Sequence, residues 1–161
     1  MDKDTIPHSR PSLSREEIKA VSSVLRSGQL SQGPKVEEFE KRIAHFIGKK
    51  EGVAVSSGSA SLHLALLALG VKTKEDEVIL PSYVCPAVLN AVYQAGGNPV
   101  IVDIDPRSYN ISAKAAGKAI TIKTRAIIVP HMFGCPADME ELSELGIPII
   151  EDCAQSIGAT F

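Results

Sequence analysis

The fold is decided by the stretch Val53-Ala-Val-Ser-Ser-Gly-Ser-Ala-Ser-Leu-His-Leu-Ala-Leu-Leu-Ala-Leu-Gly70. It begins as a short apolar run, breaks at Ser56-Ser-Gly58, and continues as an Ala/Leu-rich segment typical of a helix that ends at Gly70. A strand that leads into a helix through such a turn leaves backbone N–H groups unpaired at the positive end of the helix dipole. These groups bind anions, most often phosphate. The alternative is that Ser57 only caps a buried helix.

The rest of the chain, from Val53 onward, alternates strand and helix patterns. Apolar runs without alternation predict strands covered on both faces, at Val53–Val55, Val78–Leu80, Val100–Val102, Ala126–Val129 and Ile147–Ile150. Helical patterns lie between them, at Gly58–Leu69, Pro86–Gln94, Ala113–Ile120 and Ala137–Leu145. This order predicts an α/β fold with a mainly parallel sheet and helices on both faces. In such sheets ligands bind beyond the carboxyl ends of the strands.

Two amphipathic helices are predicted before the first strand. Ser14-Arg-Glu-Glu17 has the pattern of a capping box, and apolar residues then recur at helical spacing as far as Gly28. A turn at Gln29–Pro34 leads to a second helix that ends at Gly48. We therefore expect residues 1–50 to form an N-terminal helical arm and residues 51–161 to form part of a larger domain that continues beyond this chain.

Composition excludes several classes of protein. The 161 residues carry a net charge of −2 and only 4% aromatic residues, with no basic block, so nucleic-acid binding is not expected. The longest apolar run, Leu62–Leu69, is too short to cross a bilayer, and the N-terminus has no signal-peptide pattern. Three scattered cysteines fit reduced thiols better than disulfides. We expect a cytoplasmic protein that does not bind membranes.

Several polar residues follow the predicted strands. Glu151-Asp152 comes directly after a buried strand, where a carboxylate either faces a cationic ligand atom or caps the next turn. Gln155, three residues on, offers both a donor and an acceptor to the same crevice. Cys85 is a possible nucleophile, but the alternative of a buried or half-buried thiol is the simpler one.

Two further groups suggest other chemistry. Asp103-Ile-Asp105 resembles the Asp-x-Asp pair of many glycosyltransferases, although Asp is also common in turns before proline. His131 and Cys135, with Cys153 elsewhere, are conceivable metal ligands. Because no paired Cys-x-x-Cys supports them, we expect no metal.

Taken together, the motifs resemble the fold-type-I pyridoxal-phosphate (PLP) enzymes, specifically the sugar aminotransferases of the DegT/DnrJ/StrS type. The matching segments follow one another in family order: Gly28–Pro34, Ser56–Leu66, Asp76–Tyr83, Val102–Pro106, Pro130–Gly134 and Glu151–Gln155. One such segment is weak evidence, whereas several in order along nearly the whole chain are strong evidence.

The resemblance implies a role for each candidate residue. Ser57, Gly58, Ser59 and Ala60 match the turn whose amides hold the cofactor phosphate, and Asp152 matches the acid that pairs with the protonated ring nitrogen. Gln155 matches a residue that contacts the ring hydroxyl. Cys85 occupies the position that carries a stacking aromatic ring in many members, and Tyr83 lies two residues too early to replace it. The resemblance implies a structural role for the Asp103–Asp105 turn.

The same resemblance implies that the Schiff-base lysine lies beyond Gln155. None of the lysines present, such as Lys49, Lys72, Lys114 and Lys123, matches the family position. We therefore expect this chain to be the N-terminal part of an aminotransferase and to be inactive alone. The complete enzyme would move an amino group, usually from glutamate, to a nucleotide-linked keto sugar for polysaccharide or cell-surface sugar synthesis. It would be a homodimer to whose sites the Ser31–Pro34 loop contributes.

Two alternatives remain open. One is a non-catalytic or regulatory relative that binds cofactor or a partner without a lysine. The weaker one is a metal-dependent nucleotide-sugar glycosyltransferase that uses Asp103 and Asp105. If the chain is part of the aminotransferase, the isolated chain lacks part of its sheet and its dimer surface, so we expect it to expose apolar surface and to associate.

Overall fold

The computed structural model describes Ile6 and residues 11–160. The chain divides into two compact units, Met1–Ala54 and Val55–Phe161. Among the described residues, no helix combines the length and the apolar character that crossing a membrane requires.

The first unit contains two helices, α1 (Arg15–Ser27) and α2 (Pro34–Phe46). The predicted capping box is present: the hydroxyl of Ser14 accepts a hydrogen bond from the N–H of Glu16, and the N–H of Ser14 donates to the carboxylate of Glu17. Gly28 ends α1 with φ 73°, in the left-handed region that glycine adopts at least cost. Helix α1 begins and ends as its sequence predicts. Helix α2 includes Pro34, which was expected in the preceding turn, and ends at Phe46, two residues before Gly48.

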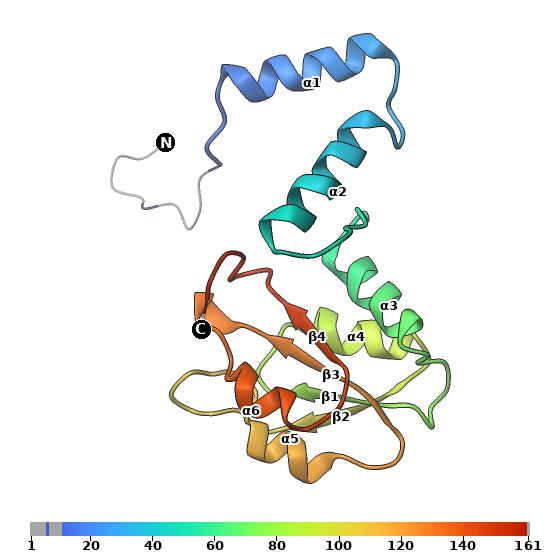
Figure 1. The fold of residues 1–161 in the computed structure, drawn as a ribbon, viewed down its shortest axis with the longest axis vertical. Helices are drawn as coiled ribbons and strands as arrows, with labels where there is room; N and C mark the ends of the chain where they lie inside the picture. The colour runs from blue at the N-terminus through green and yellow to red at the C-terminus, as the bar shows by residue number, and fades with distance from the viewer. Residues whose placement is uncertain (1–5, 7–10, 161) are drawn as a thin grey trace. The chain divides into compact units, whose positions relative to one another are not determined.

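The second unit is built on four parallel strands, in the spatial order β2-β1-β3-β4 (Figure 1). Their bounds are β1 Glu77–Pro81, β2 Asn98–Val102, β3 Thr124–Pro130 and β4 Ile149–Asp152. The helices that connect them are α3 Gly58–Ala68, α4 Pro86–Gln94, α5 Ala113–Ala119 and α6 Met139–Ser143, with a 3-10 turn, η1, at Met132–Gly134. The α/β class predicted from the sequence is confirmed.

Helices cover both faces of the sheet. Successive strand residues point to opposite sides, so each strand contributes side chains to both faces. On one face, Leu62 and Leu66 of α3 and Val88 of α4 pack in one buried cluster with Val78 and Leu80 of β1. On the other face, Ala116 of α5 and Leu142 of α6 pack with Ile79 and Ile127. The two central strands, β1 and β3, are therefore buried on both sides, and so their sequences show no polar alternation.

Three predicted elements differ from the structure. The strand expected at Ile147–Ile150 is β4, Ile149–Asp152, so Glu151 and Asp152 form the end of the strand and do not follow it. The expected strand Val53–Val55 is not a strand, and Val53 is 79% exposed. Among the described residues no neighbouring strand pairs with it, and an apolar run forms a strand only where a partner supplies the ladder hydrogen bonds. The helix expected at Ala137–Leu145 is only Met139–Ser143, because Asp138 caps its start.

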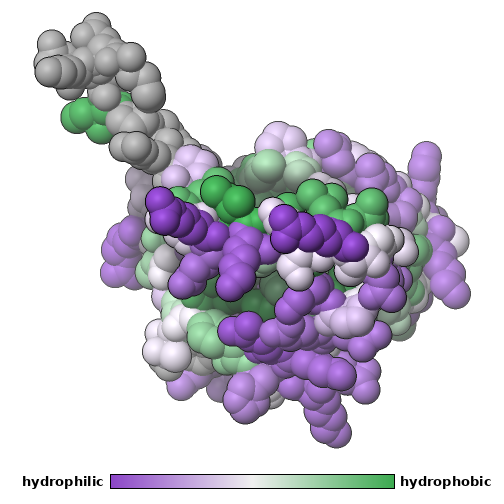
Figure 2. Space-filling model, turned by 90° about the horizontal axis from the view of Figure 1, so that it is seen from above, coloured by the Kyte–Doolittle hydropathy of each residue, from purple (hydrophilic) through white to green (hydrophobic). Residues whose placement is uncertain are grey.

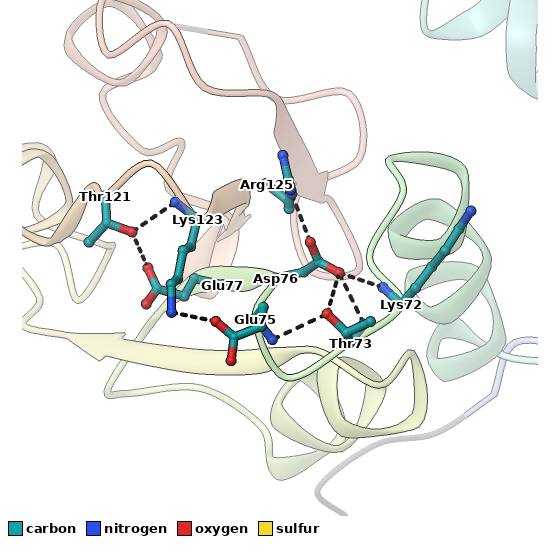
Figure 3. A network of polar contacts seen from close by, with 8 residues as sticks. All are labelled: Lys72, Thr73, Glu75, Asp76, Glu77, Thr121, Lys123 and Arg125. Atoms are coloured by element: carbon teal, nitrogen blue, oxygen red, sulfur yellow. Dashed lines mark hydrogen bonds and ion pairs between the residues drawn. The ribbon is translucent and has the colours of Figure 1, made fainter.

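A polar network closes the edge of the sheet at which the strands begin (Figure 3). The carboxylate of Asp76 accepts hydrogen bonds from Nε of Arg125 at 2.8 Å and from the N–H groups of Lys72 and Thr73. These donors, Arg125 foremost, hold the pKa of Asp76 well below its usual range. The network is structural, since it lies at the edge opposite to the one where ligands bind in parallel sheets.

Many large apolar side chains remain exposed in both units, and hydrophobic surface lies among hydrophilic side chains on the face drawn in Figure 2. In the first unit, α1 has no buried residue at all. Ile18, Val21 and Leu25 form an exposed stripe along it.

Candidate functional site

The N-terminus of α3 lies at the edge of the sheet where the strands end. Residues 69–76 join the last turn of α3 to the first residue of β1, so the C-terminus of the helix is at the edge where strands begin. Eleven residues of helix span about 16 Å, which matches the length of a five-residue strand. Ser57 and Gly58 are therefore carried to the opposite edge, at the carboxyl ends of the strands.

The start of α3 offers unpaired N–H groups. The hydroxyl of Ser57 accepts a hydrogen bond from the N–H of Ala60 at 3.2 Å, which satisfies one of the groups at this end. No described residue accepts a hydrogen bond from the N–H of Gly58 or Ser59. A Cβ at Gly58 would meet nothing within 4 Å, so there is open space over the turn. Such a turn has the donors and the room that a phosphate group requires.

Asp152 ends β4 at the same edge and faces the same side of the sheet as α3. Ile150 packs against the cluster that contains Leu62 and Leu66 of α3. Side chains two residues apart on a strand share a face, so the carboxylate of Asp152 points to the side that α3 and α4 cover. The carboxylate is half-buried, and its Oδ1 accepts a hydrogen bond of 3.1 Å from the N–H of Ala154. Its second oxygen has no partner among the described residues.

Glu151 points to the opposite side of β4. Its Oε2 atom lies 3.3 Å from Nε2 of the buried His131. The structure therefore separates two acids that are adjacent in the sequence: Asp152 faces the turn before α3, whereas Glu151 is paired with a histidine on the other face.

Cys85 is the residue that precedes α4, on the same face of the sheet as α3. Its thiol is exposed, so the expectation of a buried or half-buried thiol is wrong. Tyr83 does not take its place, because the Tyr83 ring packs instead against the rings of Tyr109 and Phe133, with centroid distances of 5.6 and 6.4 Å. The face beside Cys85 is thus left without an aromatic ring from this part of the chain.

Gln155 follows β4 and is held by the turn after β3. Its Oε1 atom accepts a hydrogen bond of 2.9 Å from the backbone N–H of Phe133. Asp152 is the last residue of β4, and Gln155 lies three residues beyond it, after the carboxyl end of the strand.

The candidate metal ligands are arranged differently from the expectation. His131, Glu151 and Cys153 bring their ligand atoms within 4.8 Å of one another, and Cys135 is not in the group. However, Nδ1 of His131 accepts a hydrogen bond of 3.0 Å from the N–H of Ala137, so Nδ1 carries no proton. Metal binding through Nε2 would require that proton on Nδ1. Burial and the charge of Glu151 also raise the pKa of the Cys153 thiol, which disfavours the thiolate.

The Asp-Ile-Asp pair does not converge on one ligand surface. Asp105 accepts hydrogen bonds from the backbone and side chain of Arg107, of which the backbone bond is 2.8 Å long. These bonds lower the pKa of Asp105 and close the turn before Tyr109. Asp103 instead lines a shallow depression with Lys114 and Lys118, which Asp105 does not line. This arrangement is that of a turn, which weighs against the glycosyltransferase alternative.

One buried residue beside the site was not singled out from the sequence. The side chain of Asn110 forms hydrogen bonds with the N–H of Met132 and the carbonyl of Cys135, on either side of Phe133. Nothing local in the sequence marks this role, because the partners lie 22 and 25 residues away.

Comparisons with known proteins show the family of the chain. The model of the DegT/DnrJ/EryC1/StrS aminotransferase family matches residues 11–161. Among solved structures, DesV of S. venezuelae is 39% identical and superposes with a TM-score of 0.86 over 89% of this chain and 40% of DesV. The PLP form of Spr1654 from Streptococcus pneumoniae, described as a putative sugar aminotransferase, is 30% identical with a TM-score of 0.90 over 95% of this chain and 44% of Spr1654.

A third structure is a GDP-4-keto-6-deoxymannose-3-dehydratase with a trapped PLP-glutamate geminal diamine. It is 31% identical, with a TM-score of 0.89 over 98% of this chain and 43% of the dehydratase. The chain thus spans about two fifths of the length of these three structures. Since the family model covers all but the first ten residues, the chain belongs to the DegT/DnrJ/EryC1/StrS aminotransferase family.

Proposed function

We propose that this chain is the N-terminal part of a PLP-dependent aminotransferase, which transfers an amino group from glutamate to a nucleotide-linked keto sugar. One observation carries the proposal. The open turn before α3 and the carboxylate of Asp152 lie at the same edge and on the same face of the sheet. In this arrangement the turn is suited to bind the phosphate group of PLP, and the carboxylate is suited to bind its ring nitrogen.

Each site residue has a distinct part in holding the cofactor. The N–H groups of the Ser57–Ala60 turn would donate hydrogen bonds to the phosphate, where the helix dipole favours negative charge. The carboxylate of Asp152 would keep a proton on the ring nitrogen through a charge-assisted hydrogen bond. Gln155 would bind the ring hydroxyl, and Cys85 would contact one face of the ring with a small, polarisable side chain.

The chemistry depends on the proton that Asp152 holds. When bound, PLP supplies a ring that withdraws electrons from the carbon next to the transferred nitrogen. Asp152 would strengthen this withdrawal by keeping the ring nitrogen positively charged. The proton shuttle and covalent anchor belong to the lysine that the family resemblance puts beyond Gln155, so this chain supplies binding and orientation.

The substrates and assembly are proposed from the relatives. The dehydratase relative is named for a GDP-linked keto sugar and was trapped with PLP and glutamate, and Spr1654 was solved with PLP and with pyridoxamine phosphate (PMP). We extend this chemistry to the present protein as a cytoplasmic homodimer, with the Ser31–Pro34 loop reaching a site formed at the interface.

The complete enzyme with Asp152→Asn tests the proposal, and Glu151→Gln is its matched control. Each variant removes one carboxyl charge from neighbouring positions of β4, but only Asp152 faces the site. Asp152→Asn should lower the rate of the half-reaction with glutamate by about two to three orders of magnitude, as when an electrostatic partner of the reacting system is removed. Glu151→Gln should retain the rate within about threefold. Equal rates in the two variants would refute the assignment.

A binding module without catalysis is the second candidate, since no lysine of this chain matches the family position. The two are distinguished by adding PLP to the complete protein and treating it with borohydride. An aminotransferase gives an imine band that borohydride traps as a covalent adduct, whereas a binding module gives neither.

A further inference from the structure

Asn110 ties the loop after β2 to the turn after β3. Its side chain is buried, with 2% of the residue exposed. Oδ1 accepts a hydrogen bond of 2.8 Å from the N–H of Met132, and Nδ2 donates one of 3.1 Å to the carbonyl of Cys135. One amide group therefore holds both ends of the η1 turn and satisfies two backbone groups there.

The turn that Asn110 holds contains an unusual backbone conformation. Phe133 has φ 55°, and Gly134 follows with φ 82°. A left-handed φ at a bulky aromatic residue is strained and persists only where the surroundings hold it. Tyr109, which precedes Asn110, has φ 62°, and Tyr109 and Phe133 are the two non-glycine residues with positive φ in the described part of the chain. Both strained residues therefore lie beside the bonds of Asn110.

The conformation of Phe133 directs its N–H toward Gln155. The bond from Phe133 N to Oε1 of Gln155, 2.9 Å long, occupies the acceptor end of that amide. An amide has one acceptor and one donor end, so this bond decides which end is left for a ligand. Within the described residues nothing accepts a hydrogen bond from Nε2 of Gln155. Gln155 thus offers a donor.

We propose that Asn110 is a positioning residue that sets Gln155 to donate to an anionic or polar oxygen of the cofactor ring. The inference rests on the proposed function, in which Gln155 faces the ring hydroxyl. Asn110 holds the η1 turn, the turn aims the Phe133 N–H at Oε1, and the amide of Gln155 presents Nε2 to the ring oxygen. Asn110 itself touches no part of the cofactor in this scheme.

The test compares two ligands in the complete enzyme: PMP and the same compound without the ring hydroxyl. Asn110→Asp keeps the acceptor for Met132 but turns a second oxygen toward the Cys135 carbonyl. Ser108→Ala is the matched control, since it removes a hydrogen bond to the N–H of Asn110 and leaves the η1 turn untouched. Gln155→Ala reports the direct contact.

The wild type and Ser108→Ala should prefer PMP over the analogue by about tenfold, the effect of one hydrogen bond. Asn110→Asp should reduce this preference to about twofold or less through weaker binding of PMP alone. Amide exchange of Phe133 should become at least tenfold faster in Asn110→Asp and stay unchanged in Ser108→Ala.

The remaining outcomes separate the two proposals. If the wild type shows no preference, Gln155 does not bind the ring hydroxyl, and both the inference and that part of the proposed function are wrong. If Gln155→Ala loses the preference but Asn110→Asp keeps it, only the role of Asn110 is wrong. Equal weakening of both ligands by Asn110→Asp would make Asn110 a general support of the fold and also overturn the inference.

Discussion

The backbone N–H of Ala137 donates a hydrogen bond of 3.0 Å to Nδ1 of His131, and both residues are buried. The imidazole is thereby held as the tautomer with its proton on Nε2, next to Glu151. His131, Glu151 and Cys153 have the composition of a metal site. The hydrogen bond to Ala137 instead makes His131 a structural link between the end of β3 and the segment before α6.

His131→Ala should destabilise the protein by about 1–3 kcal/mol, because it leaves the buried N–H of Ala137 unpaired. His131→Asn should recover most of this loss, since the Oδ1 of asparagine can accept the same hydrogen bond. Denaturant unfolding measures both. Zinc affinity, measured by competition with a chelating dye, should be the same in the wild type and both variants; zinc binding that depends on His131 would contradict the tautomer.

The Asp76 network predicts a particular dependence of stability on pH. The folded-state pKa of Asp76 lies below its ordinary value of 3.8, so folding favours the carboxylate. The stabilisation is complete well above pH 3.8 and is lost progressively as the pH falls through and below that value. Asp76→Asn should therefore lower stability at pH 7 and flatten the fall of stability between pH 5 and about pH 3.

Arg125→Met should reproduce part of this flattening, because Arg125 is the largest cause of the lowered pKa. Lys74→Met, which removes an exposed positive charge from the same loop, is the control and should keep the wild-type profile. Urea unfolding at a series of pH values measures the effect. If the free energy of unfolding falls equally steeply at acidic pH in Asp76→Asn and in the wild type, other carboxyl groups cause the loss of stability.

The turn before α3 predicts opposite effects of two neighbouring substitutions on stability. Ser57→Ala removes the cap of α3 and should cost about 1 kcal/mol. Gly58→Ala puts a methyl group into open space at a residue with negative φ, so it should leave stability unchanged or raise it by about 0.4–1 kcal/mol. If that space holds the cofactor phosphate, both variants should nevertheless bind PMP more weakly.

Pyridoxamine, which lacks the phosphate, is the control ligand for this pair. Its affinity for the complete enzyme should be the same in the wild type and in Gly58→Ala. Calorimetric titration gives the affinities, and thermal unfolding gives the stabilities. Unchanged PMP affinity in Gly58→Ala would mean that the turn is only a helix cap, as the alternative interpretation of Ser57 holds.

The sequence predicted those features whose causes are local. Helix α4 begins at Pro86 and ends at Gln94 as expected, because proline suits the first turn of a helix and Gly96 follows its end. The four paired strands were likewise marked by apolar runs. Val53–Val55 has the same composition but is no strand, since strand formation depends on a partner that composition does not reveal.

The candidate site was predictable only where its residues belong to local sequence motifs. Motifs indicated Ser57, Asp152 and Gln155 as candidate site residues. The faces to which Glu151 and Asp152 point could be assigned only from the structure, through the packing of β4. Asn110 and the strained Phe133 were missed, because their significance lies in hydrogen bonds across more than twenty residues. The residues Met132-Phe-Gly134 and Pro136 indicated a loop there, but not its backbone conformation.

The exposed stripe of α1 predicts self-association of the isolated chain. Ile18, Val21 and Leu25 are each at least 60% exposed and lie at helical spacing on one face. Sedimentation velocity should therefore show a concentration-dependent increase in the sedimentation coefficient. Val21→Lys puts a charge into the centre of the stripe and should reduce this association by about tenfold, the cost of losing roughly one buried apolar side chain. Ala20→Lys adds the same charge to the opposite face of the helix, so association should persist in it; equal behaviour of the two variants would mean that α1 is not the associating surface.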